Sequence, residues 1–271
     1  VGGSSARDFK TSYKETGAAI ADEKTISDME CGEGFDRATL SLLGKQQELL
    51  KALKATGKPL IVVYIEGRPL DKNWASENAD AVLTAYYPGQ EGGIAIADVL
   101  FGDFNPAGRL PFSVPRSVGQ IPLYYNKKAP QSHDYVEMSA SPLYPFGYGL
   151  SYTSFKYDQL KVNKADYHAN EEIEITVNVS NTGERQGEEV VQLYIRDDYS
   201  NTTRPVKELK RFQRILLEKG ENKVVSFRLN KEDLSYYNHK AEYVLEPGTF
   251  TVMVGGSSLD KDLQKVKFNV K

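Results

Sequence analysis

A glutamate held between two glycines is the feature near the front of this chain with the clearest chemical potential. The string ECGEGFDR at residues 30–37 places Glu33 between Gly32 and Gly34. Glycines lack Cβ atoms, so they let a loop adopt positive φ values and let a ligand or a neighbouring domain approach the backbone closely. A glutamate in such a loop can donate and accept a proton near neutral pH when desolvation or a second carboxylate raises its pKa. On spacing alone, a glutamate in a glycine-rich loop is more often simply solvated.

The neighbours of Glu33 provide further candidates. Glu30 is a second carboxylate three residues earlier, without the flanking glycines. Asp36 and Arg37 could orient the loop by hydrogen bonding and ion pairing, but adjacent opposite charges are common on surfaces. Cys31 could be a reactive thiol, yet no histidine lies near it in sequence, so a small buried filler is the preferred interpretation.

Candidates elsewhere in the chain are weaker. His133 and Asp134 lie in an aromatic-rich segment and could reach a neighbouring active site. Arg7 and Asp8 could lie on the rim of a site, although a solvated surface pair is the simpler interpretation. Trp74 falls in a helical pattern, which favours a place in the core over a platform for a ligand.

These residues need elements to position them, and the first half of the chain alternates helix and strand patterns. The helix-like and strand-like segments come in the order 45–56, 60–65, 71–79, 81–87 and 94–101. Gly57 follows the first helix as a stop signal, and the strand-like segments are almost continuously apolar, as parallel strands covered on both faces are. We therefore expect an α/β layered sandwich with a mostly parallel sheet over residues 1–125, with ligands beyond the carboxyl ends of its strands.

The second half of the chain is all-β in pattern. Ile173, Ile175, Val177 and Val179 alternate with polar residues, and similar short runs follow at roughly regular spacing. This pattern predicts a fibronectin type III-like sandwich over residues 155–271. Proline, glycine and tyrosine are dense just before it, which predicts an ordered linker over residues 126–154.

Composition excludes several classes of protein. With 34 basic and 37 acidic residues the net charge is −3, too small to gather nucleic acid or an anionic membrane. The apolar run at residues 60–65 is far shorter than the roughly 20 residues that span a bilayer, so no membrane insertion is expected. One cysteine and three scattered histidines do not make a zinc site, and no metal or cofactor is predicted.

The GQEGG loop at 89–93 lacks the spacing of nucleotide-binding loops, so a flavodoxin-like nucleotide binder is disfavoured.

Four strings together resemble one family, the family 3 glycoside hydrolases, which include β-glucosidases and β-xylosidases. They are GEGFDR at 32–37, LLGKQQELLKAL at 42–53, YYPGQEGGIAIADVLFGDFNPAGRLPFSVP at 86–115 and YPFGYGLSYTSF at 144–155. A fibronectin type III-like domain after such strings is also usual in that family, so the resemblance covers essentially the whole chain.

The resemblance implies a retaining exo-β-glycosidase that hydrolyses terminal β-linked sugars in oligosaccharides and glycosides. It implies that Glu33 is the general acid/base, and that the nucleophilic carboxylate belongs to an N-terminal barrel domain to which nothing here corresponds. The chain is then expected to be a C-terminal portion that is almost inactive alone, in a periplasmic or secreted enzyme. The choice between glucose and xylose is expected to depend on the barrel.

An alternative from a different class is a non-catalytic carbohydrate-binding or scaffold module. In that case the fibronectin type III-like domain would be the binding part, with Tyr236 and Tyr237 as a candidate stacking surface. Sugar binding by residues 155–271 would favour this alternative.

Overall fold

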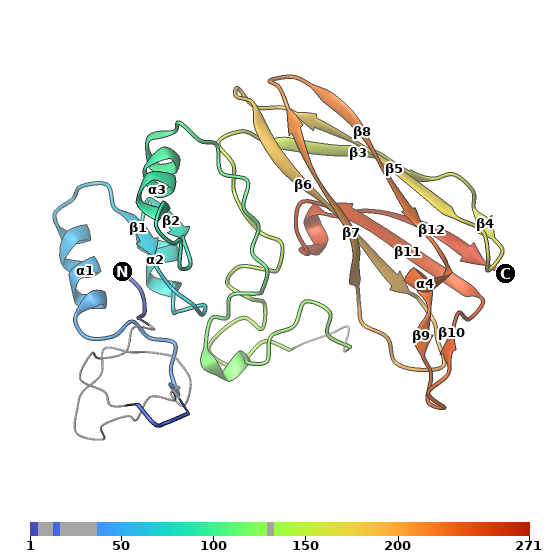
Figure 1. Ribbon diagram of the computed structural model, residues 1–271, viewed down its shortest axis with the longest axis horizontal. Helices are drawn as coiled ribbons and strands as arrows, with labels where there is room; N and C mark the ends of the chain where they lie inside the picture. Colours follow the sequence, from blue (N-terminus) through green and yellow to red (C-terminus); the bar gives the residue numbers. More distant parts are fainter. Residues whose placement is uncertain (5–12, 17–36, 129–132) are drawn as a thin grey trace. The chain divides into compact units, whose positions relative to one another are not determined.

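The computed structural model describes residues 1–4, 13–16, 37–128 and 133–271 (Figure 1). It divides into two compact units. The first, here called the α/β unit, comprises Val1–Leu100 and Pro115–Ile121, and the second, here called the β unit, comprises Phe101–Val114 and Pro122–Lys271. The domain bounds expected from sequence, at residues 125 and 154, stay a prediction.

The α/β unit contains a small parallel sheet with helices between its strands. Its elements are α1 (Gln46–Ala55), β1 (Ile61–Tyr64), α2 (Asn73–Asn78), β2 (Ala81–Thr84), α3 (Gly92–Phe101) and the 3-10 helix η1 (Val118–Gln120). Strands β1 and β2 pair in parallel with Val62 opposite Val82, and Gly2 makes a further parallel bridge to Ile65. The predicted order of helices and strands is confirmed, but β2 ends at Thr84 instead of residue 87 because the chain turns at Tyr86, whose φ is 52°.

Helix α1 ends where its sequence predicts. Gly57 adopts a φ of 72°, and its N–H donates to the carbonyl of Lys54 at 3.1 Å. Leu50 is buried, whereas Leu49 and Leu53 remain 52% and 45% exposed, so the apolar face of this helix is only partly covered. The continuous apolar pattern of β1 is likewise not buried throughout, because Ile61 is 50% exposed. A sheet of two strands and one bridge, which is what the described residues form, is too narrow to cover both faces.

The core of the α/β unit lies between the sheet and the helices. Its buried apolar residues are Leu42, Leu50, Leu60, Val62, Tyr64, Leu70 and Ala75. Trp74 packs against this cluster, which confirms its expected place in the core.

The β unit is an antiparallel sandwich. Its larger sheet has the strand order β4-β12-β11-β6-β7, its smaller sheet has the order β3-β5-β8, and a short hairpin joins β9 to β10. The strands are β3 (Phe155–Val162), β4 (Asp166–Tyr167), β5 (Ile173–Asn181), β6 (Gly187–Asp197), β7 (Glu208–Leu217), β8 (Asn222–Leu229), β9 (Tyr236–Tyr237), β10 (Tyr243–Val244), β11 (Gly248–Gly255) and β12 (Gln264–Val270). Two short helices, α4 (Lys231–Leu234) and η2 (Asp260–Asp262), lie between strands.

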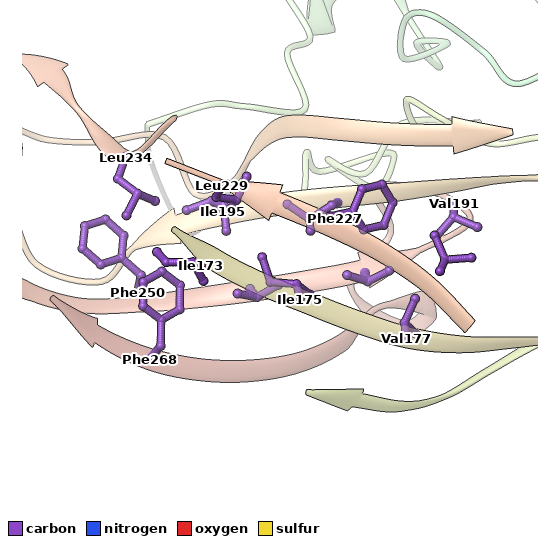
Figure 2. Packing of buried hydrophobic residues seen from close by; sticks show 14 of the residues in the cluster. Ile173, Ile175, Val177, Val191, Ile195, Phe227, Leu229, Leu234, Phe250 and Phe268 are labelled. Atoms are coloured by element: carbon purple, nitrogen blue, oxygen red, sulfur yellow. The ribbon is translucent and has the colours of Figure 1, made fainter. Parts of the chain in front are cut away.

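The two sheets enclose one apolar core, which Figure 2 shows from close by. On β5 the residues predicted to point inward, Ile173, Ile175, Val177 and Val179, are all at most 2% exposed. Ile175 pairs with Phe227 of β8, and both belong to the core cluster together with Val252 of β11. The observed burial of alternate residues on β5 therefore confirms the sandwich that the sequence pattern predicts.

Two proline- and tyrosine-rich segments before β3 pair with each other through their backbones. Val114 and Tyr144 form an antiparallel bridge, and Leu110 exchanges hydrogen bonds with Gly147 and Tyr148. A buried ion pair joins the first segment to the sandwich: Arg109 donates to the carboxylate of Glu189 on β6, which also accepts from the Tyr157 hydroxyl at 2.6 Å. Burial, followed by the charge of Glu189, raises the pKa of Tyr157 well above its ordinary value, so this phenol stays protonated.

Candidate functional site

Six of the residues singled out by chemistry lie outside the described part of the chain. These are Glu33, Glu30, Cys31, Asp36, Arg7 and Asp8. Arg37 is described, and its Nη2 donates to the hydroxyl of Thr39 at 3.3 Å. The acid/base assignment of Glu33 therefore stays a prediction. Glu33 lies in the segment between Ser4 and Arg37, and the described residues show which elements hold the two ends of this segment.

The first of these ends is attached to the carboxyl end of β1. The N–H of Gly3 donates to the carbonyl of Ile65 at 2.9 Å, and the N–H of Ile65 donates to the carbonyl of Val1 at 2.9 Å. Gly2 lies so close that a Cβ built on it would fall 1.8 Å from the Ile65 carbonyl oxygen. Because this approach leaves no room for a side chain, Gly2 fixes the start of the segment against the strand.

A side-chain clamp from α1 secures the same end. The Gln46 side chain accepts from the N–H of Gly2 at 2.7 Å and donates to the carbonyl of Gly2 at 2.9 Å. The polar Gln46 on the inner face of an otherwise apolar helix pattern is thereby explained. It satisfies both backbone groups of a residue that belongs to no complete strand.

The second end of the segment returns to the same edge of the sheet. The N–H of Asp71, which follows β1 by a short turn, donates to the carbonyl of Leu40 at 2.7 Å. The chain between Ser4 and Arg37 thus begins and ends beside the carboxyl end of β1. Ligand sites of open parallel sheets lie at this edge.

An ion pair inside the α/β unit holds the turn after β1. Glu66 and Lys72 are 1% and 2% exposed, and the Lys72 Nζ lies 2.5 Å from Glu66 Oε1. The Glu66 carboxylate also accepts from the Leu70 N–H at 3.0 Å and from the Thr84 hydroxyl of β2 at 3.2 Å. One carboxylate therefore ties together the carboxyl ends of both strands and the turn between β1 and α2.

The electrostatics of this pair follow from its burial. The ammonium of Lys72 lies 4.3 Å above the ring centre of Tyr64 and also donates to the Leu70 carbonyl at 3.3 Å. Burial lowers the pKa of Lys72, while the Glu66 charge opposes the shift. Burial, together with the negative charge of Glu66, also raises the pKa of Tyr86.

The Glu66–Lys72 pair positions the loops at this edge. Both side chains are enclosed, and the carboxylate already accepts three hydrogen bonds, so it has no open face toward a substrate. No local pattern signals the pair, because a glutamate and a lysine six residues apart across a turn match no helical or strand periodicity.

Two other predicted sites are resolved in the structure. Asp134 accepts hydrogen bonds from the Ala140 N–H at 2.7 Å and the Ser139 hydroxyl at 3.1 Å, and these bonds lower its pKa. It caps a local turn, and His133 beside it is exposed. Tyr236 is only 4% exposed, so Tyr236 and Tyr237 do not form a stacking surface, and that expectation is wrong.

The described residues contain neither a metal-binding cluster nor a membrane-spanning helix. Among residues 1–4, 13–16, 37–128 and 133–271, no group of three or more His, Cys, Asp or Glu side chains is placed to hold a metal ion. In the same ranges, no helix has the length and apolar character needed to cross a bilayer.

Comparison with known proteins identifies both halves of the chain. The glycosyl hydrolase family 3 C-terminal domain matches residues 8–152, and the fibronectin type III-like domain matches residues 189–258. A β-xylosidase of Formosa agariphila is 47% identical over 245 residues, which are 89% of this chain and 34% of that protein. A periplasmic β-glucosidase of Salmonella typhimurium is 44% identical over 237 residues, which are 83% of this chain and 31% of that protein.

Solved structures agree with these relatives. A β-glucosidase of Erythrobacter marinus has a TM-score of 0.84 and 45% identity, and the match covers 88% of this chain and 31% of that one. A β-glucosidase of Listeria innocua in complex with glucose has a TM-score of 0.83 and 37% identity, and the match covers 88% of this chain and 34% of that one. This chain thus spans about a third of the length of these relatives. The chain belongs to glycosyl hydrolase family 3, of which it carries the C-terminal α/β domain followed by the fibronectin type III-like domain.

Proposed function

We propose that this chain supplies the general acid/base, Glu33, to a retaining exo-β-glycosidase that removes terminal β-linked sugars. The observation that carries the proposal is membership of glycosyl hydrolase family 3 over a region that spans 31–34% of two relatives named β-glucosidase and β-xylosidase. A barrel domain outside these 271 residues would carry the nucleophilic carboxylate. The two domains would then share one active site.

The anchoring of the segment supports this role. Glu33 lies seven residues before Leu40, whose carbonyl is fixed to Asp71. A chain spans at most about 3.6 Å per residue, so covalent geometry alone keeps the Cα of Glu33 within about 25 Å of the Cα of Leu40. The edge of the α/β unit at the carboxyl end of β1 is where we expect the acid/base to meet its partner domain.

The proposed chemistry divides the work between two carboxyl groups about 5–5.5 Å apart. In the first step the nucleophile attacks the anomeric carbon, while Glu33 gives its proton to the glycosidic oxygen as the C–O bond breaks. In the second step the Glu33 carboxylate takes a proton from water, whose oxygen attacks the same carbon and releases the enzyme nucleophile. Glu33 must therefore begin protonated, which burial beneath a partner domain and the second carboxylate would favour by raising its pKa.

The names of the relatives set the scope of the proposed substrate and compartment. Relatives named β-glucosidase and β-xylosidase are similarly close, so terminal β-glucosides and β-xylosides are both proposed substrates. A periplasmic or secreted location is proposed because one relative is named periplasmic. Within the chain, we assign the acid/base domain to residues 1–125, an ordered linker to 126–154 and the fibronectin type III-like domain to 155–271.

A chimera tests the assignment directly. The matching third of the Salmonella periplasmic β-glucosidase is replaced by this chain, and turnover of aryl β-glucosides and aryl β-xylosides is measured for the chimera and for the 271 residues alone. We expect turnover by the chimera and almost none by the chain alone. Substantial turnover by the 271 residues alone would contradict the division between two domains.

Two matched variants of the chimera identify the acid/base. With Glu33→Gln, turnover of a glycoside with a poor leaving group should fall by about 10²–10⁴-fold, the usual contribution of a general acid. A dinitrophenyl glycoside should be far less affected in its first step, because its leaving group needs little protonation, and azide should restore turnover by forming a glycosyl azide. Glu30→Gln should leave both substrates nearly unchanged, and the reverse pattern would transfer the role to Glu30.

A further inference from the structure

The outer face of the larger sheet in the β unit carries a group of basic side chains. Arg196 of β6 and Lys267 of β12 both pair with Thr251 of β11, so the three residues lie side by side across the sheet. Two residues further along β11, on the same face, Met253 pairs with Tyr194 on one side and Lys265 on the other. Since side chains alternate along a strand, these residues point away from the core that holds Ile195 and Val252.

Segments that precede β3 build a wall beside this face. The rings of Tyr125 and Phe146 stack at 4.1 Å and pack on Tyr194 and Met253 of the sheet. Backbone bonds fix the wall, since the Val206 N–H donates to the Lys127 carbonyl at 2.9 Å and the Ser258 N–H donates to the Phe146 carbonyl at 3.0 Å. A cavity of about 560 Å³ remains between the wall and the sheet. That volume is in the range of small-molecule and oligosaccharide sites.

The cavity has a local excess of positive charge. Asp198 accepts from Lys267 Nζ at 2.8 Å and lies 3.7 Å from Arg196 Nε, so it is shared by two cations. Asp260 is likewise shared, by Lys207 at 3.1 Å and Lys265 at 3.1 Å. Each group of three therefore keeps one net positive charge. Together the two groups carry four cations against two carboxylates, 4 − 2 = +2, in a chain whose net charge is −3.

Two tyrosines on the lining are exposed. The side chains of Tyr199 and Tyr124 are 85% and 67% exposed. Such rings offer apolar faces to the C–H groups of a sugar, and the serine and threonine hydroxyls of the lining offer hydrogen bonds. Tyrosine faces combined with a net positive charge match an acidic sugar better than a neutral one.

We propose that this cavity is a binding site for an acidic glycan, a sugar chain bearing carboxylate or sulfate groups. Arg196 and Lys267 bind the anionic groups and Tyr199 contacts a sugar ring. The site lies within the β unit and takes no part in hydrolysis, so it does not depend on the role proposed for Glu33. Nucleic acid fits less well, because its phosphate backbone continues beyond this small patch over the surface of a chain with net negative charge, whereas a short acidic oligosaccharide can lie within the cavity.

Calorimetry on the 271-residue chain tests the proposal with four probes. Two probes are acidic sugars, a sulfated heparin tetrasaccharide and the carboxylated trigalacturonate. Two probes are controls, the neutral cellotetraose and a single-stranded oligothymidine. We expect at least one acidic oligosaccharide to bind, with an affinity that falls about tenfold between roughly 50 and 200 mM salt because the contacts are ionic. Cellotetraose and oligothymidine should bind at least about tenfold more weakly. Absence of binding by both acidic sugars, or equal binding of either control probe, would overturn the proposal.

Variants locate the binding within the fold. The double variant Arg196→Gln with Lys267→Gln should weaken binding at least about tenfold. The matched control, Lys223→Gln with Arg228→Gln, removes the same charge from exposed positions on β8 of the other sheet and should leave binding unchanged. Equal loss in both pairs would show a general charge effect and overturn the site.

The sugar contact is tested separately from the charge. Tyr199→Ala should weaken binding roughly fivefold, as loss of one aromatic contact does, while Tyr199→Phe should retain it. Thermal unfolding of each variant is compared with that of the parent, so that only variants with an unchanged transition enter the comparison. Inorganic sulfate should compete poorly at equal ionic strength, and competition as strong as that of the oligosaccharide would overturn recognition of a sugar.

Discussion

The Nζ of Lys72 lies 2.5 Å from Oε1 of Glu66, and both side chains are almost completely buried in the α/β unit. Removing two charges from water costs several kcal/mol each, which their attraction and hydrogen bonds must offset. The pair is therefore a poor source of net stability but a strict constraint on geometry. Whichever partner is removed alone, the other is left as a buried charge without compensation.

Replacing Lys72 should destabilise the α/β unit strongly. Lys72→Met leaves the Glu66 carboxylate buried and unpaired, so we expect a loss of about 3–5 kcal/mol in the free energy of unfolding. Trp74, the single tryptophan, packs in this unit, so its fluorescence during urea unfolding reports on this unit separately from the β sandwich.

Two controls accompany this variant. Adding Glu66→Gln to Lys72→Met removes both charges and should recover a large part of the loss. Lys45→Met removes an exposed pair with Glu48, whose side chains are 84% and 68% exposed, and should produce no measurable change. Equal effects of Lys72→Met and Lys45→Met would contradict the buried character of the pair.

Neighbouring valines on β8 test the register of the sandwich. Val225 is 2% exposed and faces the core, whereas Val224 is 65% exposed and faces outward. Val225→Ala should cost about 2 kcal/mol of unfolding free energy, because buried methyl groups are lost and a cavity remains. Val224→Ala should cost far less, and similar values from circular dichroism melts would mean that the strand is shifted by one residue.

The stability of the β unit should depend on pH through Asp197. Burial raises the pKa of this carboxyl to about 6, against the opposing effects of Arg204 and of a hydrogen bond from the Tyr199 backbone. In the unfolded chain an aspartate has a pKa of about 3.9, so between about pH 4 and pH 6 the folded protein holds a proton that the unfolded chain has lost. Stability from this group therefore falls as pH rises through that window. We expect a decrease of about 1 kcal/mol after discounting for its partial exposure.

Asp197→Asn isolates this contribution. The amide stays neutral at every pH, so the variant should gain stability relative to the parent as pH rises from 4 to 6.5, measured by urea unfolding. Asp166→Asn is the matched control of opposite sign, since hydrogen bonds from Asn269 and Lys271 lower the pKa of Asp166. Its removal should cost stability above the unfolded pKa and show no gain with rising pH.

The Arg109–Glu189 pair should decide whether residues 101–114 stay attached to the β unit. Arg109→Met leaves Glu189, whose side chain is 4% exposed, as a buried charge, and we expect a loss of about 3–5 kcal/mol. Limited proteolysis with chymotrypsin should then cut the chain at Phe104 or Phe112 faster than in the parent. Arg214→Met removes the partly exposed pair with Glu188, the preceding residue of β6, and should leave the cutting rate unchanged.

Local patterns in the sequence predict much of this fold. The alternation at Ile173 to Val179 places β5 and its inward face correctly, and Gly57 marks the end of α1. These features depend on neighbours within a few residues, so periodicity and turn chemistry are enough to find them. The partial exposure of Leu49 and Leu53 was not predictable, because it depends on how many strands the sheet provides.

The residues that build sites are harder to find in sequence. Arg109 and Glu189 are 80 positions apart, and Arg196 and Lys267 become neighbours only through their shared pairing with Thr251. Such contacts depend on strand order and register, which no local pattern contains. Glu33 is the opposite case, since a short string and its family resemblance single it out while its position lies outside the described residues.

The backbone bonds of Gly3 and Leu40 fix both ends of the stretch between them. The entropy of closing a loop grows only with the logarithm of its length, so each doubling costs about 0.6 kcal/mol. Insertions between Ser4 and Arg37 should therefore be thermodynamically cheap, provided that Gly2, Gln46 and Asp71 keep their bonds. A stretch of different length can therefore still return the chain to the same strand end.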